Sequence, residues 1–462
     1  MNRRLPPALV VYLLALIGYA ISAQGWARPV SIAPHYVYLA QALLNGHVDL
    51  IQLPPSTYDL LSFNGQWFVA GSPLPAILML PLVALFGVSF SDVAFSVGLG
   101  AINVALVYDL LGLFRRPADA TSEDVAPSAF AAVNGFSIDE PARRWLTLLF
   151  AVGTPFWYLA ALGTYWFTAH VVAVLFALLA VREALTRRRW FLAGLWLACA
   201  GFARPTVLAL APFFLALILF TARQRAAHPP LTFHASLITR YSLLVTHYSL
   251  LVTRYSLQLL LALLIGLSAH AAYNLARFGS MTDFGYAYVS GADNLTSVYA
   301  RYGGFNPRFA PCNLAVSLIA PPEVNGGVPD FITRACGYLL EGVNLSDTSA
   351  PIAPNPLGMS VFIATPALLL IVRSIRREPL LSAAWIGLLS TLIPLWLYHN
   401  TGSLQFGWRY LFDAAPLWII LLAYGARRIT RLNRGLILAS VAMNLWGFLW
   451  MFEKIAGRPW WG

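Results

Sequence analysis

The chain has 462 residues, of which 59% are hydrophobic and 11% charged, and its formal net charge is +11. A soluble domain of this length cannot bury so much apolar surface, so the composition predicts a polytopic helical membrane protein. The basic residues form short Arg clusters between apolar segments, without the aromatic interleaving of a nucleic-acid surface. We therefore expect no nucleic-acid partner.

About eleven apolar segments have the length and composition of membrane spans. The predicted spans are 8–22, 93–114, 145–162, 164–181, 190–203, 206–221, 257–277, 357–372, 380–398, 409–426 and 435–452. Most of the 30 basic residues then lie on the side that this topology assigns to the cytoplasm. We expect one all-α transmembrane domain over 1–462, in the plasma or inner membrane, with a cytoplasmic N-terminus.

The first external loop is predicted to cover 25–92 and to carry interfacial helices. Pro34–Asn45 has apolar residues at helical spacing and is expected to lie in the interface, while Asn64-Gly65 is typical of a tight turn. Pro73–Phe90 is apolar but holds three prolines. We interpret it as re-entrant or interfacial, because a full crossing would move every later Arg cluster to the outside.

Two further loops are predicted. Residues 222–256 are expected to form a cytoplasmic loop, and the heptad-length repeat TRYSLLV, THYSLLV, TRYSLQL at 239–259 is interpreted as a duplication that lengthened it. Residues 278–356 are expected to form a large external loop. It contains Cys312 and Cys336, and an external compartment permits a disulfide between them.

The candidate catalytic acids are Asp49 and Asp59 of the first loop. A carboxylate there suits a general base, or an oxygen ligand for a divalent cation, which leaves metal dependence open. The alternative is a solvated loop acid. Asp59 is the stronger candidate because it follows Tyr58 and lies between proline and glycine turns that restrict its direction.

Arginines near the ends of spans are candidate phosphate ligands, since a guanidinium binds phosphate through two parallel hydrogen bonds. They are Arg204, Arg277 and Arg409. Asp413 lies four residues after Arg409, so on a helix the two are expected to face each other, which leaves open whether Arg409 binds a ligand or its neighbour. His399, at the end of a span, is a further candidate.

Several stretches together resemble the C-type (GT-C) integral-membrane glycosyltransferases, which include protein O-mannosyltransferase, aminoarabinose transferase and arabinosyltransferase-like enzymes. The resembling features are a first helix, a long external loop with interfacial helices, and the stretches Tyr36-Val-Tyr-Leu-Ala-Gln-Ala-Leu-Leu-Asn-Gly, Gly65-Gln-Trp-Phe, Gly163-Thr-Tyr-Trp-Phe-Thr-Ala-His, Gly201-Phe-Ala-Arg-Pro, Arg277-Phe-Gly-Ser and Phe406-Gly-Trp-Arg-Tyr.

The resemblance implies transfer of a hexosyl or pentosyl group from a polyprenyl-phosphate donor to a lipid or glycan acceptor, on the outer face of the cell envelope membrane. In that family an Asp early in the first external loop is the base. The matching place here reads Ser31-Ile-Ala-Pro-His35, without a carboxylate, and Tyr36 follows as a candidate substrate contact. Three alternatives stay open: Asp49 or Asp59 substitutes, His35 is the base, or the protein is not catalytic.

A transporter or lipid flippase is the other class that this composition allows. Transporters usually show internal repeats and a site at the middle of the membrane. The heptads at 239–259 are the one repeat found in the sequence, and the external loops are large for a transporter. A polar cavity at the outer surface would favour the glycosyltransferase.

Overall fold

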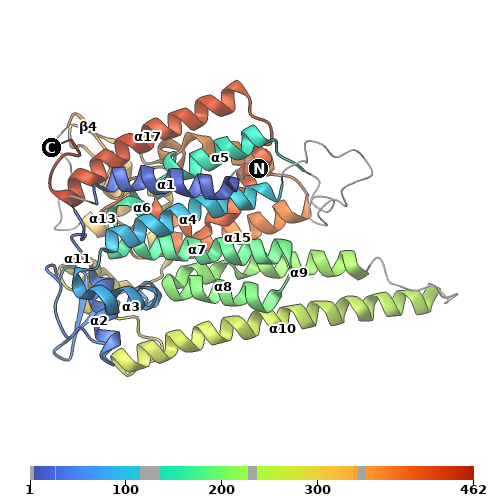
Figure 1. Ribbon diagram of the computed structural model, residues 1–462, viewed down its shortest axis with the longest axis horizontal. Helices are drawn as coiled ribbons and strands as arrows, with labels where there is room; N and C mark the ends of the chain where they lie inside the picture. The colour runs from blue at the N-terminus through green and yellow to red at the C-terminus, as the bar shows by residue number, and fades with distance from the viewer. Residues whose placement is uncertain (1–4, 26–27, 115–135, 227–236, 341–349, 462) are drawn as a thin grey trace.

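The computed structural model describes residues 5–25, 28–114, 136–226, 237–340 and 350–461. Helices lie side by side along the longest axis, and α2, α3, α11 and the end of α10 gather at one end of the bundle (Figure 1). We refer to this end as the loop end. It is where the two large polar segments of the chain meet.

Most described elements belong to the bundle. They are α1 (Pro7–Ala23), α4 (Asp92–Gly112), α5 (Glu140–Val152), α6 (Phe156–Leu162), α7 (Tyr165–Thr186), α8 (Trp190–Ala203), η2 (Pro205–Leu210), α9 (Ala211–Ala226), α10 (Leu237–Phe278), α14 (Val361–Ala364), η6 (Pro366–Ser374), α15 (Pro379–Trp396), η7 (Arg409–Ala414), α16 (Ala415–Gly425) and α17 (Arg431–Ala456).

Six of the described helices are long and apolar enough to cross a membrane, and α5 with α6, bent by 54°, would make a seventh. The six are Asp92–Gly112, Tyr165–Thr186, Pro205–Arg223, Val245–Phe278, Pro379–Trp396 and Arg431–Ala456. The other predicted spans are helical but short or interrupted; α8, for example, has 14 residues. The chain is therefore an all-α multi-pass membrane protein, and the count of eleven spans stays a prediction.

The first polar segment, 24–91, begins and ends at the loop end. The Ser31 backbone N–H donates to Asp92 Oδ1 at 2.9 Å, and the Ser31 hydroxyl donates to the other oxygen. Between Ser31 and Asp92, the proline-containing segment Pro73–Phe90 forms α3 (Leu74–Phe86) and the short η1 (Gly87–Ser89). Thirteen residues of α3 rise about 20 Å, which is less than a bilayer core of about 30 Å.

The predicted helix and turn of this segment are both present. α2 (His35–Leu44) packs against α3, and its residues Tyr36, Val37 and Leu39 are buried, so this face of the helix contacts protein. β1 (Leu60–Phe63) pairs antiparallel with β2 (Gln66–Val69). Positive φ angles at both turn residues, Asn64 and Gly65, are those of a type I′ hairpin, which confirms the tight turn.

The repeat region differs from the prediction. Residues 237–256 are not a loop but the first half of α10, a 42-residue helix. No Gly or Pro interrupts the three heptads, so nothing in the local sequence ends the helix. At 1.5 Å per residue the 42 residues of α10 are about 63 Å long, and in Figure 1 its N-terminal end extends beyond the neighbouring helices.

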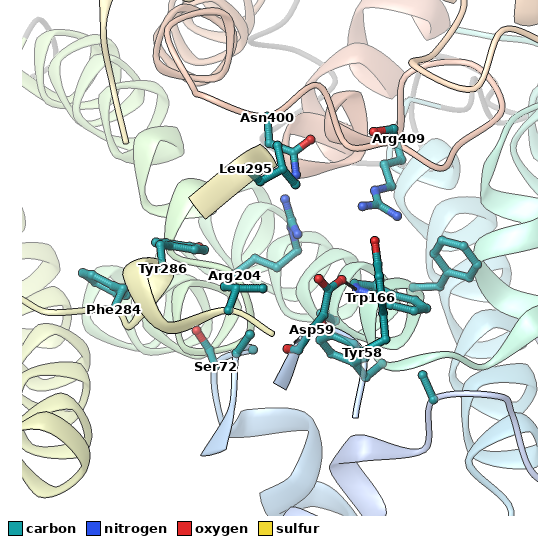
Figure 2. A pocket seen from close by; sticks show the side chains of 18 of the residues that line it. Tyr58, Asp59, Ser72, Trp166, Arg204, Phe284, Tyr286, Leu295, Asn400 and Arg409 are labelled. Atoms are coloured by element: carbon teal, nitrogen blue, oxygen red, sulfur yellow. Dashed lines mark hydrogen bonds between the residues drawn. The ribbon is translucent and has the colours of Figure 1, made fainter. Parts of the chain in front are cut away.

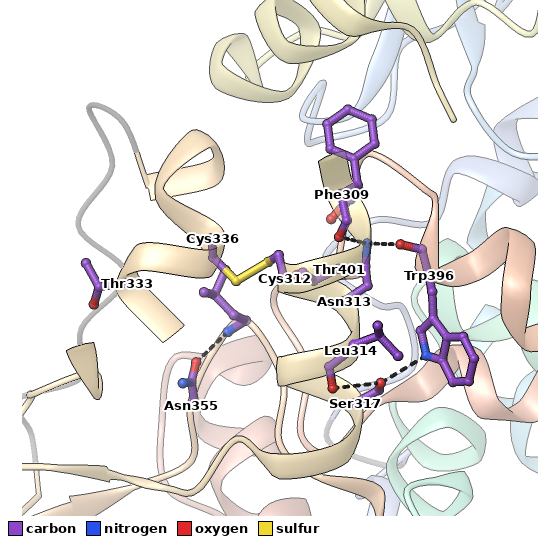
Figure 3. The surroundings of a disulfide bond; sticks show 12 residues. Phe309, Cys312, Asn313, Leu314, Ser317, Thr333, Cys336, Asn355, Trp396 and Thr401 are labelled. Atoms are coloured by element: carbon purple, nitrogen blue, oxygen red, sulfur yellow. Dashed lines mark hydrogen bonds between the residues drawn. A yellow bond between two sulfur atoms is a disulfide. The ribbon is translucent and has the colours of Figure 1, made fainter. Parts of the chain in front are cut away.

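The second polar segment, 279–356, contains short helices and a disulfide. Its elements are η3 (Tyr286–Tyr288), α11 (Asp293–Tyr302), η4 (Pro307–Phe309), α12 (Ala310–Leu314), the π-helical η5 (Ala315–Ile319), β3 (Glu323–Val324), α13 (Asp330–Leu340) and β4 (Ile352–Ala353). Cys312 is bonded to Cys336, as the sequence allowed. Beside it, the Asn313 amide donates to the carbonyls of Trp396 and Tyr398, which ties this segment to the end of α15 (Figure 3).

Replacing both Cys312 and Cys336 by Ser should destabilise this segment. The bridge joins residues 24 apart, and a loop of this length contributes on the order of 3 kcal/mol by restricting the unfolded chain. We expect a lower midpoint of thermal unfolding in detergent, and the same lower midpoint for the unchanged protein under reducing conditions. Cys199→Ser, at the unpaired cysteine, is the control; equal midpoints with and without the bridge would contradict the prediction.

Candidate functional site

A cavity of about 550 Å³ lies at the loop end, between the two polar segments and the ends of the bundle helices. Its wall contains polar residues from positions far apart in the chain, with aromatic side chains between them (Figure 2). Of the residues that the sequence singled out, it brings together Tyr36, Asp59, Arg204, Arg277, His399 and Arg409.

Asp59 is held in place by two other parts of the chain. Its backbone N–H donates to the Ser290 carbonyl at 2.9 Å, and Trp166 Nε1 donates to its Oδ2 at 2.8 Å. Its φ of 61° is in the left-handed region, which Asp tolerates better than most residues but which still costs free energy. This backbone conformation directs the carboxylate into the cavity (Figure 2).

Burial raises the pKa of Asp59. The hydrogen bond from Trp166 and the positive charge of Arg409 oppose this rise. A carboxylate with a raised pKa is a better proton acceptor than a solvated one, which is the property that a general base needs.

Arg409 is a cavity cation without a carboxylate partner among the described residues. Its side chain is 8% exposed, its Nε makes no hydrogen bond, and its guanidinium lies 5.6 Å from the centre of the Phe167 ring. In Figure 2 the Arg409 side chain points into the cavity, toward the side that carries Asp59. A buried guanidinium in this state is suited to an anionic ligand.

Of the two alternatives left open for Arg409, pairing with Asp413 is not found, because Asp413 binds Arg204 instead. Nε and Nη2 of Arg204 donate to the two Asp413 oxygens at 2.7 and 3.0 Å, Thr206 donates as well, and His170 Nδ1 lies 3.4 Å away. Both Arg409 and Asp413 lie in η7, a 3₁₀ helix. With three residues per turn, positions four apart point in different directions.

Proline explains why Arg204 reaches this partner. Pro205 disfavours helical geometry at the preceding residue, and Arg204 is extended, with φ −147° and ψ 108°. The extended residue ends α8, and its side chain lies at the cavity wall beside the Tyr410 ring, 5.3 Å from the ring centre. Since its charge is matched by Asp413, Arg204 is less available to a ligand than Arg409.

Arg277 and Tyr36 complete the predicted residues of the wall. Arg277 is 6% exposed and donates to the Val69 carbonyl at 3.0 Å and to Asn274 Oδ1 at 2.8 Å. It thus joins the β-hairpin to the end of α10, and it carries no carboxylate partner among the described residues. The Tyr36 hydroxyl is buried without a hydrogen-bond partner.

Three of the predicted site residues do not line the cavity. Asp413 lies behind the wall in the ion pair just described. Asp49 lies on the outside of the first segment, where it contacts His47 Nδ1 and Gln66 Nε2, each at 3.2 Å. It is therefore separated from the other candidates, because it does not line the cavity.

His35, the third, is fully buried and stacks on Tyr165, with 4.5 Å between ring centres. Its Nε2 lies 3.1 Å from the Ser56 carbonyl, and burial lowers its pKa to about 4. Because it packs beneath the wall, it has no access to a ligand in the cavity.

Sequence reasoning missed Trp166 and Tyr286 as cavity residues. Trp166 was visible as part of the stretch from Gly163 to His170, but nothing local indicated a hydrogen bond to Asp59, 107 positions earlier. Tyr286 lies in a polar segment without a periodic pattern, so only the packed structure identifies it.

The residues do not fit a cation site built by the protein. Among the described residues, no group of three or more His, Cys, Asp or Glu side chains converges. Of the described residues that line the cavity, Asp59 is the single carboxylate. A divalent cation prefers several oxygen ligands. The sequence left open whether the protein depends on such a cation.

No protein-family model and no curated protein matches the chain. Two solved structures of an oligosaccharyltransferase from Archaeoglobus fulgidus are similar to it. One, the archaeal oligosaccharyltransferase AglB in complex with an inhibitory peptide and a dolichol-phosphate, is 14% identical, with a TM-score of 0.39 over 94% of this chain. The other, an apo form, is 13% identical, with a TM-score of 0.40 over 97%.

This chain covers 56% of the length of each of those chains.

Asp413→Asn should destabilise the protein strongly. It leaves the Arg204 charge without its partner next to the bundle core, and breaking a buried ion pair costs about 3–5 kcal/mol. A double variant, Arg204→Met with Asp413→Leu, removes both charges and should recover most of the thermal midpoint. The measurement is thermal unfolding in detergent; a double variant no more stable than Asp413→Asn would contradict this account.

Proposed function

We propose that the protein is a membrane glycosyltransferase that moves a sugar from a polyprenyl-phosphate donor to an acceptor hydroxyl. The observation that supports this most is the placement of Asp59 and Arg409 on one cavity wall. Asp59 is a buried carboxylate with a raised pKa, and Arg409 is a buried guanidinium without a carboxylate partner. A base and an anion-binding group are the two parts that this reaction requires.

The reaction is a single displacement. Asp59 accepts the proton of the acceptor hydroxyl as its oxygen bonds to the anomeric carbon of the sugar. The bond from that carbon to the phosphate oxygen breaks, and the electron pair leaves with the polyprenyl phosphate. Arg409 stabilises the charge that develops on this leaving group. Attack opposite to the leaving group inverts the anomeric carbon.

The position of the cavity suits a lipid substrate. Arg204 follows the last residue of α8, and Arg277 is the penultimate residue of α10, so both lie where bundle helices end. A polyprenyl phosphate has its headgroup at the membrane surface and its tail among the helices. We propose that the loop end faces the outside of the cell membrane, with about eleven spans and a cytoplasmic N-terminus.

The same position favours an enzyme over a transporter. A transporter site is expected near the middle of the membrane, between broken helices of related halves. The cavity instead lies at one end of the bundle, and described residues of the polar segments 24–91 and 279–356 form part of its wall. The acceptor, a lipid or a glycan, is not specified by these features.

Asp59→Asn should lower the transfer rate by about 10²–10⁴-fold, the usual contribution of a positioned base. The assay uses purified protein in nanodiscs with a panel of labelled polyprenyl-phosphate sugars and an acceptor extract. Asp49→Asn is the matched control, because Asp49 lies outside the cavity and should keep full activity. Full transfer by Asp59→Asn would remove Asp59 as the base.

The pH profile separates a base from a structural carboxylate. Only deprotonated Asp59 accepts a proton, so the rate should fall as the pH is lowered through the pKa of Asp59. Because burial raises that pKa, the fall should occur above the ordinary carboxyl range near 4.

Arg409→Gln should lower kcat/KM by about tenfold to a hundredfold. It removes a charge-assisted hydrogen bond to the phosphate, typically about 1.5–3 kcal/mol. Arg409→Lys keeps the charge without the planar fork and should be intermediate. Arg301→Gln, at an exposed arginine of α11, is the control. Equal kcat/KM for Arg409→Gln and Arg301→Gln would argue against phosphate binding by Arg409.

A further inference from the structure

His399 lies on the cavity wall inside a group of three tyrosines. Its ring centre is 4.4 Å from that of Tyr398, 5.5 Å from Tyr299 and 5.7 Å from Tyr286, and each ring meets it at a steep angle. Tyr286 and Tyr398 line the cavity together with it. We call these four residues the tyrosine–histidine group.

The backbone that carries His399 is fixed from the second polar segment. The His399 N–H donates to the Gly304 carbonyl at 3.0 Å, and the Asn306 N–H donates to the Leu397 carbonyl at 2.8 Å. The Asn313 amide donates to the Tyr398 carbonyl at 2.8 Å. The ring is therefore held in one position before any ligand binds, as expected of a binding residue.

The imidazole lacks part of its hydrogen bonding. The side chain is 4% exposed, and its Nδ1 is buried without a hydrogen-bond partner. Burial lowers its pKa to about 4, so the ring is neutral at physiological pH. An unpaired buried polar atom costs free energy that a purely packing residue such as Phe would not cost.

The chemistry of the group suits a sugar better than a phosphate. A neutral imidazole offers one donor and one acceptor, and a hydroxyl can use either. A phosphate is bound by cationic side chains, and Arg409 is a cation on the same cavity wall. Aromatic side chains provide apolar surface for the carbon skeleton of a sugar ring, as in most small-molecule sites.

We propose that His399, with Tyr286 and Tyr398, forms a subsite for a neutral sugar hydroxyl, separate from the anion-binding Arg409. This inference rests on the proposed function. It adds that this part of the cavity wall recognises a sugar hydroxyl of the substrate. The hydroxyl belongs either to the sugar of the donor lipid or to a sugar of the acceptor. Both sources offer the same chemistry, so the experiment has to separate them.

Binding of defined lipids to protein in nanodiscs tests the donor sugar. The probes are polyprenyl phosphate and polyprenyl phosphate bearing mannose, glucose or arabinose. His399→Phe keeps the aromatic packing and removes both nitrogens. We expect it to weaken the best-bound sugar lipid about tenfold, the loss of about 1.4 kcal/mol, and to leave sugar-free polyprenyl phosphate unchanged. His399→Gln, which keeps a donor and an acceptor, should recover part of the affinity.

The transfer assay tests the acceptor sugar. If His399→Phe binds every lipid normally but raises KM for the acceptor without lowering kcat, the subsite holds the acceptor sugar. His247→Phe, at an exposed histidine of α10, is the control. Unchanged donor affinity and unchanged acceptor KM in His399→Phe would overturn the inference, as would equal weakening of sugar-bearing and sugar-free lipids.

These outcomes differ from failure of the proposed function. An unsubstituted protein that binds none of the lipids would overturn the proposed function and this inference with it. An unsubstituted protein that binds and transfers sugars, with a silent His399→Phe, would overturn this inference alone.

Discussion

The ion pair between Arg204 and Asp413 determines the electrostatics of the whole cavity. It joins the extended residue after α8 to the 3₁₀ helix η7, 209 positions later, through two hydrogen bonds. It also neutralises the charge of Asp413, which lies four residues after Arg409 in the sequence. Arg409 is consequently left without a carboxylate partner among the described residues, and the cavity keeps a cation for an anionic ligand.

The carboxylate opposite this cation is placed by a second long-range arrangement. The Asp59 N–H donates to the Ser290 carbonyl and the Ser290 N–H donates to the Leu60 carbonyl, so the two polar segments are joined at the acid itself. Trp166, at the start of α7, then fixes the carboxylate. Three separate parts of the chain thus converge on one side chain, a rigid support of the kind that positions a reacting group.

The cavity combines charged and neutral recognition. Arg409 can bind an anion, Asp59 can accept a proton, and the neutral His399 can form a hydrogen bond with a hydroxyl. Burial has opposite effects on the last two, since it raises the pKa of the Asp59 carboxyl and lowers the pKa of the His399 imidazole. One apolar environment therefore produces both a stronger base and an uncharged hydrogen-bonding group.

The sequence alone determined the class of protein, the approximate position of most helices, the hairpin turn at Asn64 and Gly65, and the residues worth testing. These properties depend on composition, on apolar segments and on turn chemistry, which are local. The first half of α10 was missed because near-identical heptads suggest a duplication that lengthens a loop, whereas the helix continues through them without a Gly or Pro to end it. Asp49 and Asp59 were also alike in sequence, as two acids of one loop.

Only the tertiary structure decided which acid lies in the cavity, which arginine is neutralised and that His35 is packed away from any ligand. Each of these outcomes depends on partners that are distant in the chain: Ser290 and Trp166 for Asp59, Asp413 for Arg204, and Tyr165 for His35. A charge is available or paired according to its neighbours in space, because electrostatic and hydrogen-bond free energies fall off over a few ångström.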